Sequence, residues 1–174
     1  MKPKEKIEQA LLQYEFVIKM LTYIESGKLD KKEFDIDTTI IHAKSYNRFP
    51  DNTFNTYDDL KLAAENNFSL MLGALTITIE SCLAENGIPN NSQDTTPRGQ
   101  LRQLIYMIRC AYAHDIMEPK WVIKDRYVKK LTCTAGPYTK EVELDELNGT
   151  HFNIEQVGGH GFYFELIKEI RNWL

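Results

Sequence analysis

The sequence has few cysteines, and their spacing suggests neither a crosslink nor a metal site. Its 174 residues include only Cys82, Cys110 and Cys133, which are odd in number, far apart and without a CxxC pair. This pattern argues against a disulfide framework and against a zinc site. Because no other ligand set stands out, we expect neither a metal nor a cofactor.

The chain also lacks an excess of positive charge. Its formal net charge is -4, so the whole protein does not attract nucleic acid, and any contact with a polyanion must come from a local basic patch. The N-terminus is polar and leads into an amphipathic segment, unlike a signal peptide. No apolar run approaches the roughly 20 residues of a membrane span. We therefore predict a cytoplasmic protein without membrane contact.

Helical periodicity dominates the first two thirds of the chain. Apolar residues recur at helical spacing over residues 4–26. A second helix is expected from Tyr57 to about Asn86, and its second half is apolar nearly all round, which is typical of a helix buried on several sides or packed against another subunit. Thr96 and Pro97 are a favoured N-cap and first residue for a third helix, which Pro119 must stop.

Two segments have a different texture. We expect part of residues 28–57, which include a β-branched piece at 38–41, to form a short helix or an ordered cover over the core, because a structureless loop of that length is unusual. After Pro119 the composition favours strands and turns, with strands expected over residues 121–123, 126–134 and 139–144, a turn at 135–137 and a closing helix over 162–173.

These segments predict one mainly α fold. An antiparallel helical bundle occupies residues 1–118, and a β-rich tail, residues 119–174, ends in a helix that packs on the same domain.

The most informative stretch is residues 107–115, at the end of the third helix. Arg109 keeps its charge and offers a planar fork that suits phosphate oxygens. His114 belongs to the residue type that most readily acts as acid or base near neutrality. In a regular helix the two lie roughly 140° apart. They converge on one ligand only if the helix end loosens or a symmetry-related copy supplies the second residue, which favours a dimer.

A structural alternative remains open for the same residues. In it, Arg109 pairs with Asp115 or Glu118, and His114 caps the helix C-terminus. Considered without any resemblance, this alternative is favoured, because structural ion pairs are common.

The Arg109-x4-His114 spacing at the end of a late helix resembles the signature of the HEPN superfamily, and residues 108–115 followed by Pro119 and Trp121 resemble a bacterial HEPN-like branch. The resemblance covers roughly residues 4–115. It implies a four-helix-type bundle that dimerises so that both Arg/His pairs line one cleft. Active members are metal-independent endoribonucleases, in which the histidine transfers protons around the ribose 2′-hydroxyl and the arginine holds the scissile phosphate. Cleavage leaves a cyclic phosphate.

On this resemblance we assign Arg109 and His114 as catalytic, and four neighbours as substrate-binding: Arg102, Tyr112, Asp115 and Lys120. Arg102 precedes Arg109 by seven residues and so shares its helix face. Lys120 begins a basic cluster that extends to Lys130 and is suited either to a phosphate backbone or to a solvated strand face.

Cys110 departs from the polar residue that RNA-cutting members usually carry after the motif arginine, because a thiol is a weak hydrogen-bonding group. Three hypotheses therefore stand. The first is a ribonuclease, a toxin or phage-defence effector with an antitoxin protein as partner. The second is a non-catalytic HEPN-like dimerisation module that binds a nucleotide or a protein. The third is a structural dimer whose Arg/His pair belongs to an interface.

Overall fold

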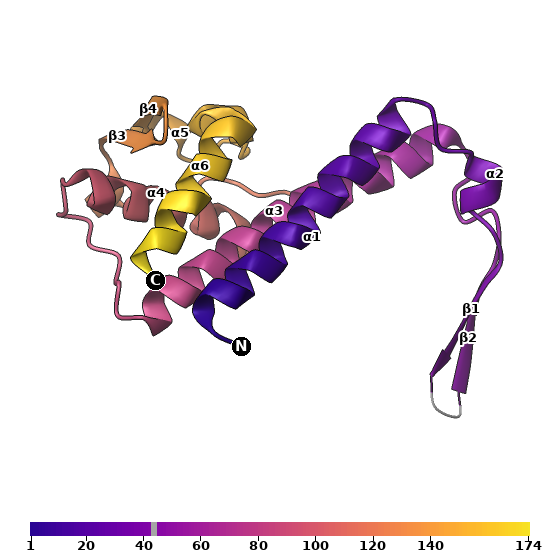
Figure 1. Cartoon of the computed structure of the whole chain (residues 1–174). Helices are drawn as coiled ribbons and strands as arrows, with labels where there is room; N and C mark the ends of the chain where they lie inside the picture. The colour runs from indigo at the N-terminus through magenta and orange to yellow at the C-terminus, as the bar shows by residue number, and fades with distance from the viewer. Residues whose placement is uncertain (43–44) are drawn as a thin grey trace.

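The computed structural model describes residues 1–42 and 45–174 and is mainly helical, as predicted (Figure 1). Its longer helices are α1 (Pro3–Glu25), α3 (Tyr57–Glu85), α4 (Pro97–His114) and α6 (Gly159–Trp173). Shorter helical pieces are α2 (Lys31–Phe34), α5 (Leu144–Leu147), η1 (Asp125–Tyr127) and η2 (Ile154–Val157). Two separate antiparallel hairpins pair β1 (Thr38–His42) with β2 (Ser45–Phe49) and β3 (Lys130–Ala135) with β4 (Tyr138–Glu143).

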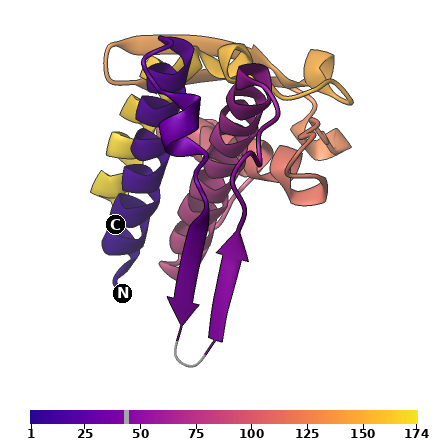
Figure 2. The same ribbon diagram turned by 90° about the vertical axis from the view of Figure 1, so that its right-hand side faces the viewer.

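Helices α1 and α3 lie side by side as a long antiparallel pair (Figures 1 and 2). The start of α3 is fixed by a capping box, in which the Thr56 hydroxyl accepts the Asp59 N–H at 3.1 Å and the Asp59 carboxylate accepts the Thr56 N–H at 2.8 Å. Each of these bonds satisfies a backbone donor that the first helical turn leaves unpaired. The observed start of α3 confirms the boundary predicted at Tyr57.

The middle of α3 is buried between neighbours, which explains why it is apolar nearly all round. Leu72, Leu75 and Ile79 are buried in the main core. Gly73 faces Tyr112 of α4, and a Cβ at that position would lie 2.5 Å from the Tyr112 Cδ1, so the glycine allows the close approach of the two helices.

By length and composition α3 is long and apolar enough to cross a membrane, contrary to the expectation that no run approaches this. The same test is passed by core helices of soluble proteins, and part of α3 is buried in the core. Absence from membranes and cytoplasmic location stay predictions.

Helix α4 begins as predicted. The Thr96 hydroxyl accepts the Gly99 N–H at 3.0 Å, and Pro97 is the first helical residue. The helix ends at His114, before Pro119, because Asp115 adopts an extended conformation. The predicted Arg109/His114 motif therefore lies in the last turns of a regular helix.

The tail follows the prediction in part. The hairpin β3–β4 and its turn at Gly136-Pro137 are observed, and α6 begins slightly earlier than predicted. Residues 121–129, in contrast, form no strand. Trp121 is buried and its indole N–H donates to Gln156 Oε1 at 2.8 Å, while the Ile123 N–H donates to Asn148 Oδ1 at 2.9 Å. The Trp121 backbone bonds to the backbone of Gly149 and Thr150, and the Ile123 N–H to a side chain, so no continuous strand ladder forms. Tail residues share one apolar core with the bundle.

Residues 28–57 lie in part over the helices: Leu29 is buried in a small apolar cluster with Ile24 and Leu60, and Phe54 and Tyr57 pack against that cluster. The segment also forms the short helix α2 and the hairpin β1–β2, which stands away from the helices (Figures 1 and 2). The β-branched piece at 38–41 does form a strand. The β-branched composition of this piece is typical of a strand, whereas its position depends on how the segment is anchored.

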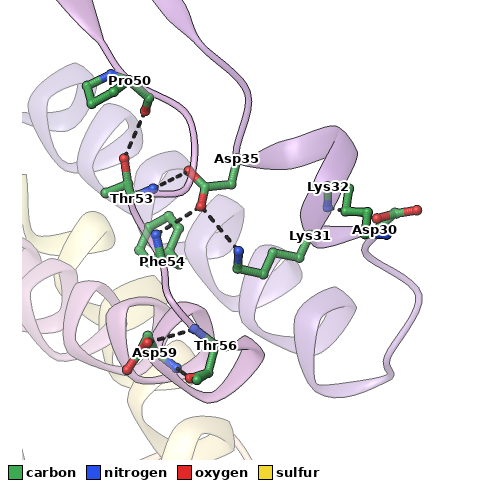
Figure 3. Close-up of polar contacts among 9 residues, drawn as sticks. All are labelled: Asp30, Lys31, Lys32, Asp35, Pro50, Thr53, Phe54, Thr56 and Asp59. Carbon is green, nitrogen blue, oxygen red and sulfur yellow. Dashed lines mark hydrogen bonds and ion pairs between the residues drawn. The ribbon is translucent and has the colours of Figure 1, made fainter.

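The anchor is the Asp35 carboxylate at the base of this hairpin (Figure 3). Its two oxygens accept the backbone N–H groups of Thr53 and Phe54, each at 2.9 Å. The backbone carbonyl of Asp35 also accepts the Asn52 N–H, at 3.3 Å. The Lys31 ammonium lies 3.5 Å away. Burial opposes ionisation of this side chain, but the two N–H groups and the ammonium outweigh it, so the pKa of Asp35 lies below its ordinary value.

We expect the Asp35→Asn substitution to lower the thermal unfolding midpoint at pH 7 by about 4 °C, because the neutral amide loses the charge-assisted bonds. Since the folded pKa is depressed, this stabilisation is present above the ordinary aspartate value of about 4 and is lost as the pH falls below it. The difference between the two proteins, measured by circular dichroism melts, should therefore shrink at pH 3. Asp51→Asn, an exposed neighbour, is the control with little expected effect.

Candidate functional site

The second half of α4 borders a hollow of about 230 Å³ that faces the tail segment 122–127. We call it the α4 hollow. The residues that line it come from both sides: Tyr106, Met107, Arg109, Cys110, Ala113, His114, Val122, Lys124 and Tyr127. Both predicted catalytic residues therefore belong to one depression within a single chain.

The helix geometry explains how Arg109 and His114 reach the same hollow. One face of α4 borders the hollow. It consists of Tyr106, Cys110 and Ala113, which follow one another at spacings of four and three. Arg109 and His114 lie on the two flanks of this face. The helix stays regular to His114, and no loosening of its end is needed for both side chains to border the hollow.

The structural alternative for Arg109 does not appear in the structure. Among residues 1–42 and 45–174, no ion pair joins the Arg109 guanidinium to a carboxylate. The Asp115 carboxylate instead accepts the N–H groups of Met117 and Glu118, at 2.9 and 3.1 Å. These bonds, with the nearby Lys120 ammonium, hold the pKa of Asp115 below its ordinary value. Arg109 thus keeps its donors available to an anion from outside.

Aromatic rings form the inner wall of the hollow. The Tyr106 and Tyr127 rings lie 5.5 Å apart, and the Tyr127 hydroxyl accepts the Asn90 Nδ2–H at 2.5 Å. Burial, together with the adjacent Cys110 thiol, raises the pKa of Tyr106, so its hydroxyl stays protonated near neutrality and can donate. Tyr106 was missed from sequence, although its spacing of four from Cys110 was a signal for it.

A second hollow, of about 430 Å³, lies on the other side of Arg109. It shares Tyr106 and Arg109 with the α4 hollow, and α3 supplies its remaining wall, from Ile77 to Ala84. Arg109 therefore stands between two depressions and can reach a phosphate bound in either.

None of the four predicted substrate-binding residues lines the α4 hollow. Arg102 is buried, where its Nη2 donates to Glu80 Oε1 at 2.9 Å, its Nη1 donates to the other oxygen, and its Nε donates to the Ile88 carbonyl at 3.0 Å. This guanidinium joins α4 to α3 and borders neither hollow. The spacing of seven residues puts Arg102 on the same side of α4 as Arg109, but the spacing does not show that the chain covers this side at Arg102.

Tyr112 is buried against Gly73, with its ring 5.3 Å from the Phe152 ring, and burial raises its pKa to about 12. Asp115 and Lys120 are exposed beyond the end of α4 and do not line the α4 hollow. Lys120 forms a backbone bridge with His151, and its ammonium lies 4.0 Å from Glu118. Lys124, from the same basic cluster, is the lysine that does border the hollow.

The lining chemistry suits an anion. Arg109, His114 and Lys124 surround the α4 hollow, and no Asp or Glu is among its lining residues. In the part of the chain that the structure describes, no group of three or more His, Cys, Asp or Glu is placed to hold a metal ion. Comparison with protein-family models, curated proteins and solved structures finds no match to this chain.

Proposed function

We propose that the chain is a HEPN-like, metal-independent endoribonuclease whose Arg109 and His114 act on an RNA phosphate in the α4 hollow. The observation that carries the proposal is that these two side chains border one hollow that has no carboxylate among its lining residues. The absence of an ion pair on Arg109 among the described residues supports it further. The proposal includes a homodimer through α4, an antitoxin protein as partner and a role as a toxin or phage-defence effector.

The chemistry requires one proton acceptor and one fixed cation. His114 takes the proton of the ribose 2′-hydroxyl as the 2′-oxygen attacks phosphorus, and the bond to the 5′-oxygen breaks as that oxygen takes a proton from solvent water. The Arg109 fork binds the phosphate oxygens, on which negative charge accumulates. The products are a 2′,3′-cyclic phosphate and a 5′-hydroxyl end. Neither step uses a metal ion.

A direct test is the cleavage of a mixed RNA pool by the wild-type protein in excess EDTA, with the product ends identified by mass spectrometry. We expect fragments that carry cyclic phosphate or 3′-phosphate ends. A folded protein that leaves the pool intact, or one that leaves 5′-phosphate ends, contradicts the proposed reaction.

The second candidate is a non-catalytic module that binds a nucleotide in the same hollow. Cys110 favours it, because this half-buried thiol stands on the α4 hollow where active relatives are expected to carry a more polar group. The neighbouring Tyr106 ring can contact a base. Binding without cleavage needs only Arg109 and the aromatic wall.

We expect uridine 2′,3′-cyclic phosphate to stabilise the wild-type protein and not the Arg109→Ala variant. A ligand that binds only the folded state at 100 times its Kd adds about 2.7 kcal/mol to the free energy of unfolding. Differential scanning fluorimetry measures the effect, and uridine, which lacks the phosphate, is the matched control. Equal stabilisation of both proteins would show that Arg109 does not bind the phosphate.

A further inference from the structure

Two side chains, Tyr106 and Arg109, border both hollows. They line the α4 hollow, and they also line the second hollow, of about 430 Å³, whose other wall belongs to α3. Among the residues that the structure describes, these two are the only ones that the linings share, and His114 lines the α4 hollow alone. Tyr106 and Arg109 therefore form a ridge between the two depressions.

The order of three side chains along α4 suits an in-line displacement at phosphorus. In such a reaction the attacking and leaving oxygens lie on opposite sides of the phosphorus atom, so the group that takes a proton and the group that gives one flank the phosphate. His114 follows Arg109 by five residues, and Tyr106 precedes it by three. At a rise of about 1.5 Å per residue, Tyr106 and His114 are separated by roughly 12 Å along the helix axis, with the cation between them.

The Tyr106 hydroxyl has a proton to give. Burial, and then the neighbouring Cys110 thiol, raise the pKa of Tyr106 above its ordinary value, so the phenol holds its proton near neutrality. Its ring is half-buried and lies 5.5 Å from the Tyr127 ring, which fixes its place on the ridge. A guanidinium keeps its proton in proteins, so Arg109 binds the phosphate and Tyr106 is the acid of the ridge.

We infer that Tyr106 is a third catalytic residue of the RNA cleavage proposed above, on which this role rests. His114 takes the 2′-hydroxyl proton as the 2′-oxygen forms its bond to phosphorus. The bond between phosphorus and the 5′-oxygen breaks, and the Tyr106 hydroxyl gives its proton to that oxygen. The phenolate then takes a proton from solvent water and His114 releases one to it, so water remains the final source of the proton on the leaving oxygen.

The ridge also gives the RNA strand a direction. The nucleotide that carries the 2′-hydroxyl lies in the α4 hollow beside His114, because the second hollow is not lined by this imidazole. The leaving nucleotide lies beyond Tyr106, against α3 in the second hollow. Both hollows of α4 thus hold parts of one substrate.

The test compares two short RNAs that differ in one atom. The first contains a linkage that the wild type cuts in the mixed pool, and the second has sulfur in place of the 5′-oxygen at this linkage. A thiolate leaves without a proton, because a thiol is a far stronger acid than an alcohol. We expect Tyr106→Phe to slow cleavage of the oxygen substrate by about 10²-fold or more, and to leave cleavage of the sulfur substrate within about threefold of wild type. His114→Ala should slow both.

Tyr23→Phe is the matched control, because it removes a phenolic hydroxyl from a 46% exposed residue of α1 outside both linings. It should cleave both RNAs as the wild type does. Tyr106→Phe keeps the ring, so its unfolding midpoint should stay that of the wild type. The inference is overturned if Tyr106→Phe cleaves the oxygen substrate at the wild-type rate, or if it slows both substrates equally, as a residue that only positions the RNA would. A wild type that cuts no linkage in the pool contradicts the proposed function itself, and the role of Tyr106 with it.

Discussion

Replacing His114 with alanine is expected to lower RNA cleavage in EDTA by about 10²- to 10⁴-fold, the usual contribution of a positioned general acid or base. The imidazole borders the α4 hollow at the last residue of α4, where it is exposed and can reach a bound ribose. Because the reaction as proposed has no metal-bound hydroxide, nothing else in the lining takes the 2′-hydroxyl proton as readily. The loss should appear in kcat more than in KM.

The measurement is single-turnover cleavage of a short labelled RNA by wild type, His114→Ala and His151→Ala. His151 is an exposed histidine outside the hollow, so its removal should leave the rate within about twofold of wild type and excludes a general effect of losing an imidazole. All three proteins should have the same unfolding midpoint. If a well-folded His114→Ala protein cleaves RNA at the wild-type rate, His114 does not act as a general acid or base.

The helices of this chain were predictable because local signals define them. Thr96 and Pro97 begin α4, Thr56 and Asp59 begin α3, and both pairs act within one helical turn. The Arg109 and His114 pair was also singled out from sequence, but its convergence was expected to need a loosened helix end or a second copy, whereas both residues border one hollow beside a regular helix. The sequence did not reveal the opposite wall of the hollow, which consists of Val122, Lys124 and Tyr127 from a different part of the chain.

The errors concern residues whose surroundings come from distant segments. Residues 121–129 have strand-forming composition, but the Trp121 backbone bonds to residues 149 and 150 and the Ile123 N–H to the Asn148 side chain, so no ladder forms. Strand β1 forms as its β-branched composition suggests, yet the Asp35 carboxylate at the base of the β1–β2 hairpin is 18 residues from its bonding partner Thr53. Periodicity within a segment contains no information on such partners.

The role of Arg102 could not be predicted from its own segment either, because its bonding partners lie on other segments. Its removal is expected to have a large effect on stability. Its side chain is 4% exposed, and its guanidinium donates two hydrogen bonds to the Glu80 carboxylate and one to the Ile88 carbonyl. Arg102→Ala leaves a largely buried carboxylate without its partner, so we expect the free energy of unfolding to fall by about 3–5 kcal/mol. Urea unfolding followed by circular dichroism measures it, provided that the m-value stays constant.

Two further variants separate stability from substrate binding. Arg98→Ala removes an exposed arginine from the same helix, whose guanidinium lies 4.9 Å from the Trp173 ring, and should cost about 0.5–1 kcal/mol. Arg102→Met/Glu80→Met removes both buried charges, and apolar pairs at such sites regain most of the stability. If Arg102 acts only between α3 and α4, this double variant cleaves RNA or binds the cyclic nucleotide as the wild type does. A stable double variant that has lost both would return Arg102 to the substrate-binding residues, because the loss could not then come from unfolding.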